Sequence, residues 1–288
     1  MTSAVTGSRA LEKPLPSEID VYGLTHRGHV RSENADHFLI ASFHRAMHVH
    51  ASSIPASAFA SHSADSRGYV FLVADGVGAF AQAANGSARA IRSVAQCLVD
   101  MSEVSLPSDP AREEEVVNRI RAAFAEAHET LLQLDERGEP GSAITTLTML
   151  IAIWPRAFIV HAGDSRAYRL RQGILTRLTT DQTMAQAMID AGAMTRDSAE
   201  ASPLKHVLLS ALGSAQVDPQ VLVQNLERQD VMLLCTDGLT KHVGDDEIHE
   251  HMSRPVSSES ICGTLIDLAL ERGGEDNVTV VVGKARIL

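Results

Sequence analysis

The sequence has 288 residues, of which 44 % are hydrophobic and only 4 % aromatic, and its formal net charge at pH 7 is -11. This length suits one large domain or two small ones, with a core built mainly from aliphatic side chains. The acidic balance, with no basic patch, argues against nucleic-acid binding, and no apolar run approaches the roughly 20 residues that a membrane-spanning helix needs.

The cysteines and the N-terminus bear on compartment and domain organisation. Cys97, Cys235 and Cys262 are widely spaced and form neither a CxxC pair nor a disulfide framework, so we expect a cytoplasmic protein. The N-terminal residues are rich in Ser, Ala and Pro and lack the apolar stretch of a secretory signal. We therefore expect a flexible segment over residues 1–18 and a single domain over residues 19–288.

The first half of the chain predicts strands followed by two helices. The expected strands lie at residues 21–24, 35–42 and 69–74. Residues 43–67 are rich in Ala, Ser and His without a clear period, which is typical of a loop insertion. Apolar residues at helical spacing then predict helices over about 85–101 and 112–134.

The second half of the chain is dominated by strands. They are expected at residues 144–153, 157–162, 167–170, 221–226, 231–235 and 278–282. Helices are predicted over 184–191 and 259–272, each followed by a glycine. Short connections between successive strands favour antiparallel sheets over regular strand–helix alternation.

Four aspartates lie at the edges of these strands with glycine nearby. They occur in Ala74-Asp75-Gly76, Gly163-Asp164-Ser165, Thr236-Asp237-Gly238 and Gly274-Glu275-Asp276. A single aspartate at a strand end is most often a turn residue, but four repeats of the arrangement predict that the carboxylates gather where the strand ends meet. A fifth aspartate, Asp36, follows Arg31-Ser32-Glu33-Asn34-Ala35.

Such a cluster would need protons or cations. Two carboxylates 4 Å apart repel by about 4 kcal/mol at an effective dielectric constant near 20. Oxygen ligands suit hard cations such as Mg²⁺ or Mn²⁺, and two such ions about 4 Å apart can activate a water and bind a phosphoryl group. The aspartates therefore predict a metal centre that acts on phosphate.

Five motifs, in this order, resemble those of the type 2C (PPM family) Ser/Thr protein phosphatases of bacteria. They are Arg31-Ser32-Glu33-Asn34-Ala35-Asp36, Val73-Ala74-Asp75-Gly76-Val77-Gly78, Ala162-Gly163-Asp164-Ser165-Arg166, Cys235-Thr236-Asp237-Gly238-Leu239 and Gly274-Glu275-Asp276-Asn277-Val278. The resemblance covers about residues 22–283. It implies an α+β fold with two antiparallel β-sheets packed as a central sandwich, flanked by α-helices, with metals at one edge.

The resemblance also implies metal ligands. Asp75 would bridge two metal ions, and the Gly76 carbonyl would bind one of them. Asp237 and Asp276 would complete the other ion's ligands, and Asp164 would join Asp237 at a third site. The implied cofactors are two or three Mn²⁺ or Mg²⁺ ions.

The implied reaction is hydrolysis of phosphoserine and phosphothreonine by direct attack of a metal-activated water. Asp36 would hold metal-bound water, and Arg31 would bind the substrate phosphate, for which a guanidinium offers bidentate contacts. The expected partners are phosphorylated proteins that a Ser/Thr kinase supplies, with neither nucleic acid nor membrane involved, and the protein is expected to be a monomer. Residues 183–203 are expected to form a flap beside the site.

Several positions depart from the family's pattern. Ala35 stands where Glu or Gln is common, Ile144 replaces the glycine of Gly-Thr-Thr, His206 replaces an Asn of the flap, and residues 43–67 are longer than usual. None of these changes removes an implied metal ligand.

Other functions fit the sequence less well. A cysteine phosphatase is excluded because no cysteine has an arginine six positions later. The segment 76–81 fits the G-x-G-x-x-A pattern of dinucleotide-binding proteins, but Asp75 beside it would repel a pyrophosphate. His44, His48 and His50 fit an exposed loop better than a transition-metal site. The alternative that stays open is a catalytically inactive phosphoprotein-binding module of the same fold.

Overall fold

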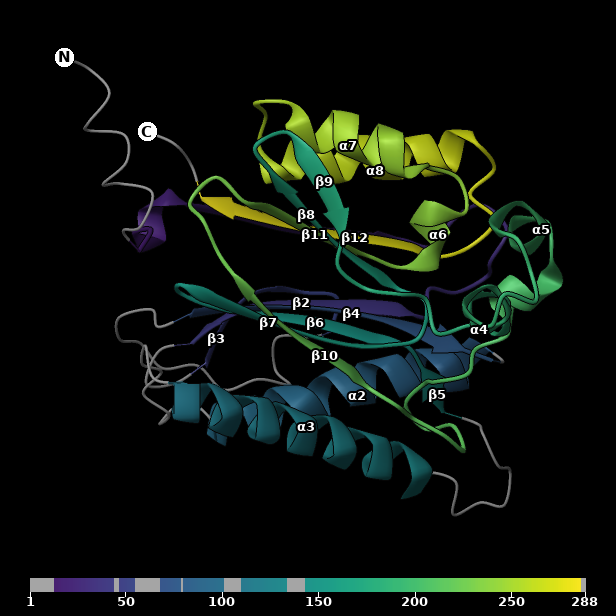
Figure 1. The fold of residues 1–288 in the computed structure, drawn as a ribbon, viewed down its shortest axis with the longest axis horizontal. Coiled ribbons are helices and arrows are strands. Elements are labelled where there is room, and N and C mark those ends of the chain that lie inside the picture. Colours follow the sequence, from purple (N-terminus) through teal and green to yellow (C-terminus); the bar gives the residue numbers. More distant parts are fainter. Residues whose placement is uncertain are drawn as a thin grey trace.

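Two antiparallel sheets face each other and carry helices on their outer sides (Figure 1). The computed structural model describes residues 13–43, 47–54, 68–78, 80–100, 110–133 and 143–285. Every strand pairing within these residues is antiparallel. The predicted α+β sandwich is therefore confirmed, and the parallel sheet of a dinucleotide-binding domain is excluded for the described part of the chain.

The first sheet contains the chain's last strands together with its first. Its order is β1 (Ile19–His26), β12 (Val278–Ala285), β11 (Val231–Cys235), β8 (Arg166–Arg171) and β9 (Ile174–Arg177). Helices α7 (Asp245–Ser253) and α8 (Ser258–Glu271) cover its outer face, as Figure 1 shows. Apolar side chains from this sheet and these two helices form one buried cluster, which includes Leu233, Val280 and Ile261.

The second sheet lies on the helices of the first half of the chain. Its order is β10 (Gln220–Asn225), β7 (Arg156–Ala162), β6 (Leu147–Ile153), β4 (Gly68–Val77), β2 (Asp36–Phe43) and β3 (Met47–Ser52), and the short β5 (Ile144–Thr145) pairs with β4. Helices α2 (Phe80–Asp100) and α3 (Pro110–Gln133) pack on its outer face (Figure 1).

The central strands are buried on both faces, so their side chains divide between two apolar layers. Along β2, Phe38 and Ile40 pack between the sheets, whereas Leu39 and Ala41 pack toward α2 and α3. This is the two-residue alternation of a strand. A strand buried on both faces reads as a continuous apolar run, which is why these strands could be predicted from sequence.

The structure corrects several predicted boundaries. Strand β3 lies inside the segment 43–67 that was expected to be a loop; residues 44–46 and 55–67 lie outside the described residues. Helix α2 begins at Phe80, five residues before the expected start. The expected strand 144–153 divides at Thr146, because β5 pairs with the end of β4 and β6 pairs farther back along it.

Short elements were missed. They are β9, α5 (Arg196–Glu200), α6 (Asp237–Thr240) and α7. In α7 only Ile248 and Met252 are buried, so the sequence offers one apolar pair instead of a repeating stripe. None of the helices in the described segments is long and apolar enough to cross a membrane.

The expected flap is built from short helices. Residues 183–203 contain α4 (Met184–Asp190) and α5, followed by a single 3-10 turn over Pro203–His206. The Thr183 and Thr195 hydroxyls accept the backbone N–H groups of Gln186 and Ser198 and so cap α4 and α5. The two ends of this region are held together by the Met184 N–H, which donates to the Val207 carbonyl, and by the bridge between Thr183 and Leu208.

A buried histidine in β7 predicts a pH-dependent stability. The Thr148 hydroxyl lies 2.9 Å from Nδ1 of His161, and the Thr180 carbonyl lies 3.1 Å from Nε2. Burial lowers the pKa of His161 to about 4, whereas a histidine in the unfolded chain titrates near 6.5. The unfolded chain therefore takes up the proton first, and His161's contribution to stability is lost as the pH falls from about 6.5 toward 4.

We expect protonation of His161 in the unfolded chain to lower the free energy of unfolding by about 2 kcal/mol when the pH falls from about 7.5 to about 5. Chemical denaturation of wild type and His161→Gln at both pH values, in chelator, measures the difference. The loss should be smaller by that amount in His161→Gln. Identical pH dependence in the two proteins would contradict the prediction.

Candidate metal centre

The predicted aspartates lie at or near the ends of five strands, and four of them line one cavity. Asp237 opens α6, which lies at one end of the sandwich (Figure 1). Asp36 opens β2 and pairs in register with Asp75 near the end of β4. Asp164 follows β7, Asp237 follows β11 at the start of α6, and Asp276 precedes β12. Because neighbouring strands are antiparallel, one strand's start lies beside the next one's end, so five distant segments deliver their carboxylates to one place.

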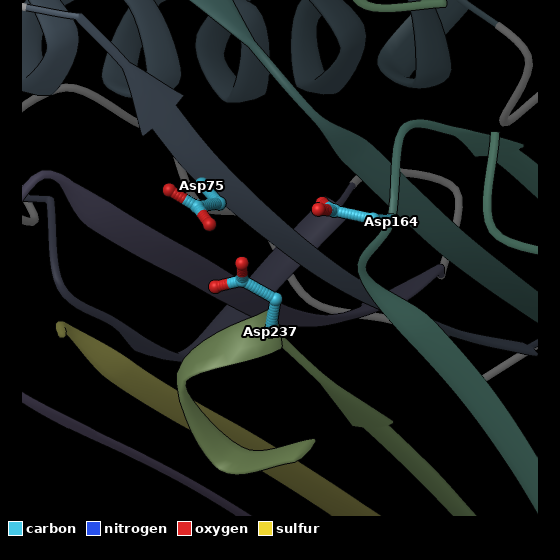
Figure 2. A group of neighbouring side chains, drawn as sticks. All are labelled: Asp75, Asp164 and Asp237. Carbon is cyan, nitrogen blue, oxygen red and sulfur yellow. The ribbon is translucent and has the colours of Figure 1, made fainter. Parts of the chain in front are cut away.

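Three of these carboxylates converge directly. Asp75, Asp164 and Asp237 each place an oxygen within 4.8 Å of the others, and Figure 2 shows their side chains pointing into a common space. Desolvation, followed by repulsion from neighbouring carboxylates, raises the pKa of Asp75 and of Asp164 well above the usual range. Carboxylates held in this way favour a bound proton or cation.

Asp36 is buried beneath this group, with 1 % of its surface exposed. Its Oδ2 accepts the hydroxyls of Thr236 and Thr279 at 2.7 and 2.8 Å, while Oδ1 finds no hydrogen-bond partner among the described residues. Burial raises the pKa of Asp36 to about 7, although the two threonine hydroxyls oppose the shift. Such a partnerless buried oxygen is costly unless a cation or water satisfies it.

Two basic side chains form ion pairs with Asp276. Arg31 holds it bidentately, with Nε 2.8 Å from Oδ1 and Nη2 2.9 Å from Oδ2. Lys241 Nζ lies 2.7 Å from Asp276 Oδ2 and 2.7 Å from Asp237 Oδ2. Desolvation alone would raise the pKa of Asp276, but the hydrogen bonds from Arg31 and Lys241 lower it below the usual value.

Two threonines fix the backbone of Asp75. The Thr146 hydroxyl accepts the Asp75 N–H at 3.1 Å, and the Thr145 hydroxyl donates to the Asp75 carbonyl at 2.8 Å. Gly76 follows in a closely packed position, where an added Cβ would lie 2.3 Å from the Ala83 carbonyl oxygen. Only glycine fits there, and its lack of a side chain lets the backbone lie this close to its neighbours.

The turn that carries Asp164 is braced from behind. Gly163 adopts a φ of +116° beneath the Thr146 side chain, a conformation that favours glycine. The Gly163 N–H donates to the side-chain oxygen of Gln182, and the backbone N–H of Gln182 donates to the Gly163 carbonyl. Arg166 holds Asp181 through Nε and Nη2 at 3.0 and 2.7 Å, which ties the segment before the flap to this turn.

A cavity of about 690 Å³ lies where the aspartates converge. The walls include the predicted residues Arg31, Asp75, Gly76, Asp164, Asp237 and Asp276. Lys205 and His206, which follow the flap in sequence, also line the cavity. Asp36 does not line it but is buried beside Asp75, its partner in strand register. The structure thus brings all the predicted site residues to one place, although their individual roles stay predictions.

The donors present fit hard divalent cations. All are carboxylate or backbone oxygens, which Mg²⁺ and Mn²⁺ prefer. Asp237 Oδ1, like Asp36 Oδ1, is buried without a hydrogen-bond partner in the described part of the chain. The buried oxygens without partners and the convergence of the carboxylates both point to a cation site.

Sequence reasoning missed several residues of this site. Lys241 follows Asp237 by four residues, and that helical spacing was the available signal for their ion pair. Thr145, Thr146 and Thr236 lie in family patterns, but nothing in the sequence indicated which aspartate each hydroxyl contacts, because Asp36 and Asp75 are distant from them in sequence.

A model of the family described as protein phosphatase 2C matches residues 46–263 of this chain. The chain belongs to the protein phosphatase 2C family. The predicted family is therefore confirmed, and the fold places the five motifs of this phosphatase 2C chain around one cavity.

Relatives of this phosphatase 2C chain include bacterial Ser/Thr phosphatases. It is 42 % identical over 138 residues to the serine/threonine protein phosphatase PstP of Mycobacterium tuberculosis, a match that covers 48 % of this chain and 27 % of PstP. It is 28 % identical over 215 residues to the Listeria monocytogenes serine/threonine phosphatase stp, covering 74 % and 83 % of the two chains. The matched part therefore spans about a quarter of PstP.

Solved structures show the same fold. The crystal structure of the Mycobacterium tuberculosis phosphatase PstP/Ppp superposes with a TM-score of 0.73 at 29 % identity, covering 93 % of this chain and 99 % of that one. The PstP catalytic domain in complex with two manganese ions gives a TM-score of 0.70 at 28 % identity, covering 93 % and 99 %.

Proposed function

We propose that this protein is a divalent-metal-dependent hydrolase that removes phosphate from phosphoserine and phosphothreonine in proteins. The observation that carries the proposal is the convergence of Asp75, Asp164 and Asp237 on one space, above the buried, partly unsatisfied Asp36. The PstP catalytic domain, 28 % identical, is a complex with two manganese ions. Mn²⁺ or Mg²⁺, in two or three positions, is the corresponding cofactor here.

The proposed roles are those that the family resemblance implies. Asp75, Asp237 and Asp276 would hold two ions together with the Gly76 carbonyl, and Asp164 would contribute to a third with Asp237. Bound divalent ions supply Lewis acidity and a nucleophilic water at neutral pH. Each carboxylate has a fixed place before substrate arrives, so little reorganisation is needed when charge develops on the phosphate.

Two further residues have proposed roles beside the ions. Asp36 is buried and held by two threonine hydroxyls, and its Oδ1 would accept a hydrogen bond from a water at the metal centre. Arg31 lines the cavity with its side chain 48 % exposed, so its guanidinium can turn from Asp276 to the phosphate oxygens. Arg31 would then exchange a bidentate contact with the Asp276 carboxylate for one with phosphate, an anion of matching geometry.

A covalent phosphoenzyme has no support in the described site. Burial raises the pKa of the Cys235 thiol to about 12, so it carries no thiolate at neutral pH, and the Cys97 and Cys262 side chains do not line the cavity. Direct hydrolysis needs no protein nucleophile. The substrates we propose are products of Ser/Thr kinases, acted on by a cytoplasmic monomer that binds neither nucleic acid nor membranes.

The test is hydrolysis of a phosphothreonine peptide with Mn²⁺, with Mg²⁺ and in excess chelator. We expect turnover with metal and loss of nearly all of it in chelator, because the carboxylates alone would repel the phosphate. A cysteine-directed alkylator should leave the rate unchanged. Full activity in chelator, or inactivation through Cys235, would contradict the mechanism, and normal Mn²⁺ binding without turnover would favour the inactive phosphoprotein-binding module instead.

A further inference from the structure

The ammonium group of Lys241 lies among the proposed metal ligands. Its Nζ contacts Oδ2 of both Asp237 and Asp276 at 2.7 Å. The Lys241 side chain is 23 % exposed, because its charged end lies between the carboxylates on the cavity wall. Helix α6 sets this geometry, since residues four apart lie on one helix face.

An ammonium has three donors and no acceptor, so it cannot act as a metal ligand. It neutralises carboxylates by using the same oxygen lone pairs that a divalent cation needs. A lysine and a metal ion therefore compete for Asp237 Oδ2 and Asp276 Oδ2. Like charges also repel at close range, which makes simultaneous occupancy costly even after a small movement of the side chain.

The other side of the centre differs. Within the described residues, neither Asp75 nor Asp164 forms an ion pair with a basic side chain, whereas Asp276 pairs with both Arg31 and Lys241. The two sides of the cavity therefore offer unequal negative charge. A cation held by Asp75 would meet a carboxylate with no ion-pair partner, whereas a cation held by Asp237 and Asp276 would have to displace the Lys241 ammonium.

We propose that Lys241 is a built-in competitor for the divalent ion that Asp237 and Asp276 would share. This inference rests on the proposed function and adds a regulatory property to the same site. The second ion binds only when the lysine withdraws, so its affinity is set lower than that of the first. Activity therefore requires a higher concentration of free divalent cation than it would if Lys241 were absent.

Calorimetric titration of the metal-free protein with Mn²⁺ tests the inference without measuring turnover. We expect two binding steps in wild type. Lys241→Gln should tighten the weaker step by about tenfold or more and change the tighter one by less than about threefold, because removing a full charge acts mainly on the ion beside it. Lys241→Arg, which keeps the charge, should resemble wild type.

The matched control is Lys205→Gln. Lys205 lines the same cavity and loses the same charge, but it pairs with Glu200 on the flap at 3.2 Å and contacts no proposed ligand. Its effect on either step should stay below about threefold. Lys241→Met serves as a second neutral variant if Lys241→Gln does not fold.

The outcomes separate the two proposals. Equal or weaker Mn²⁺ binding in the neutral Lys241 variants, compared with wild type, would overturn the role of Lys241 and leave the proposed function standing. An equal gain in Lys205→Gln would also overturn it, because the effect would then be one of general charge. Absence of Mn²⁺ binding in every variant would overturn the proposed function and this inference together.

Discussion

Asp75→Asn and Asp237→Asn should each lower kcat/KM for a phosphothreonine peptide by roughly 10³-fold. Both aspartates belong to the convergent group of carboxylates. Asparagine keeps the shape but removes the charge, and the Lewis-acid contribution of a bound metal is worth several kcal/mol, where each 1.36 kcal/mol is about tenfold in rate.

These losses should occur without unfolding. Desolvation and repulsion by neighbouring carboxylates disfavour the charged form of Asp75 in the metal-free protein, so Asp75→Asn should raise its melting temperature or leave it unchanged. Asp36→Asn should cost less activity, because its proposed contact with metal is through water. Steady-state kinetics, Mn²⁺ titration and thermal melting of each variant provide the comparison.

The matched control is Asp246→Asn. Asp246 is an exposed acid in the first turn of α7 and does not line the cavity, so its replacement changes the same charge elsewhere. Its kcat/KM should stay within about twofold of wild type. Normal turnover by both Asp75→Asn and Asp237→Asn would remove the carboxylate cluster from the mechanism.

Arg31→Ala should lower kcat/KM by roughly 10- to 150-fold, mainly through KM. A hydrogen bond to a charged group is worth about 1.5–3 kcal/mol, and that free energy gives the range. Arg31→Lys should recover only part of the loss, because an ammonium lacks the bidentate fork. The Mn²⁺ affinity of Arg31→Ala should not fall, because Arg31 competes for Asp276 and ligates no metal.

Arg27→Ala controls for general effects on this loop. Arg27 is exposed in the same turn, donates to the Ser32 carbonyl at 3.1 Å and does not line the cavity. Its kcat/KM should therefore resemble that of wild type. An Arg31→Ala enzyme with unchanged kcat/KM at saturating Mn²⁺ would exclude Arg31 from phosphate binding and leave it as the partner of Asp276.

The amino-acid sequence by itself determined the sheets and the positions of the acids. Central strands such as β4 and β11 are buried on both faces, so their continuous apolar runs identify them locally. Asp75 and Asp237 follow those runs directly, and the order of the five motifs identified the family. Each of these features depends on residues that are neighbours in the sequence, so the sequence alone is enough to predict it.

Only the tertiary structure decided what surrounds the aspartates. The Thr236 and Thr279 hydroxyls reach Asp36 across 200 and 243 residues of sequence, and Arg31 reaches Asp276 across 245. Such contacts follow from strand order and register, which local spacing does not encode. Lys241 illustrates the boundary: its pairing with Asp237 follows from helical spacing, but its contact with Asp276 exists only because β12 lies beside β11.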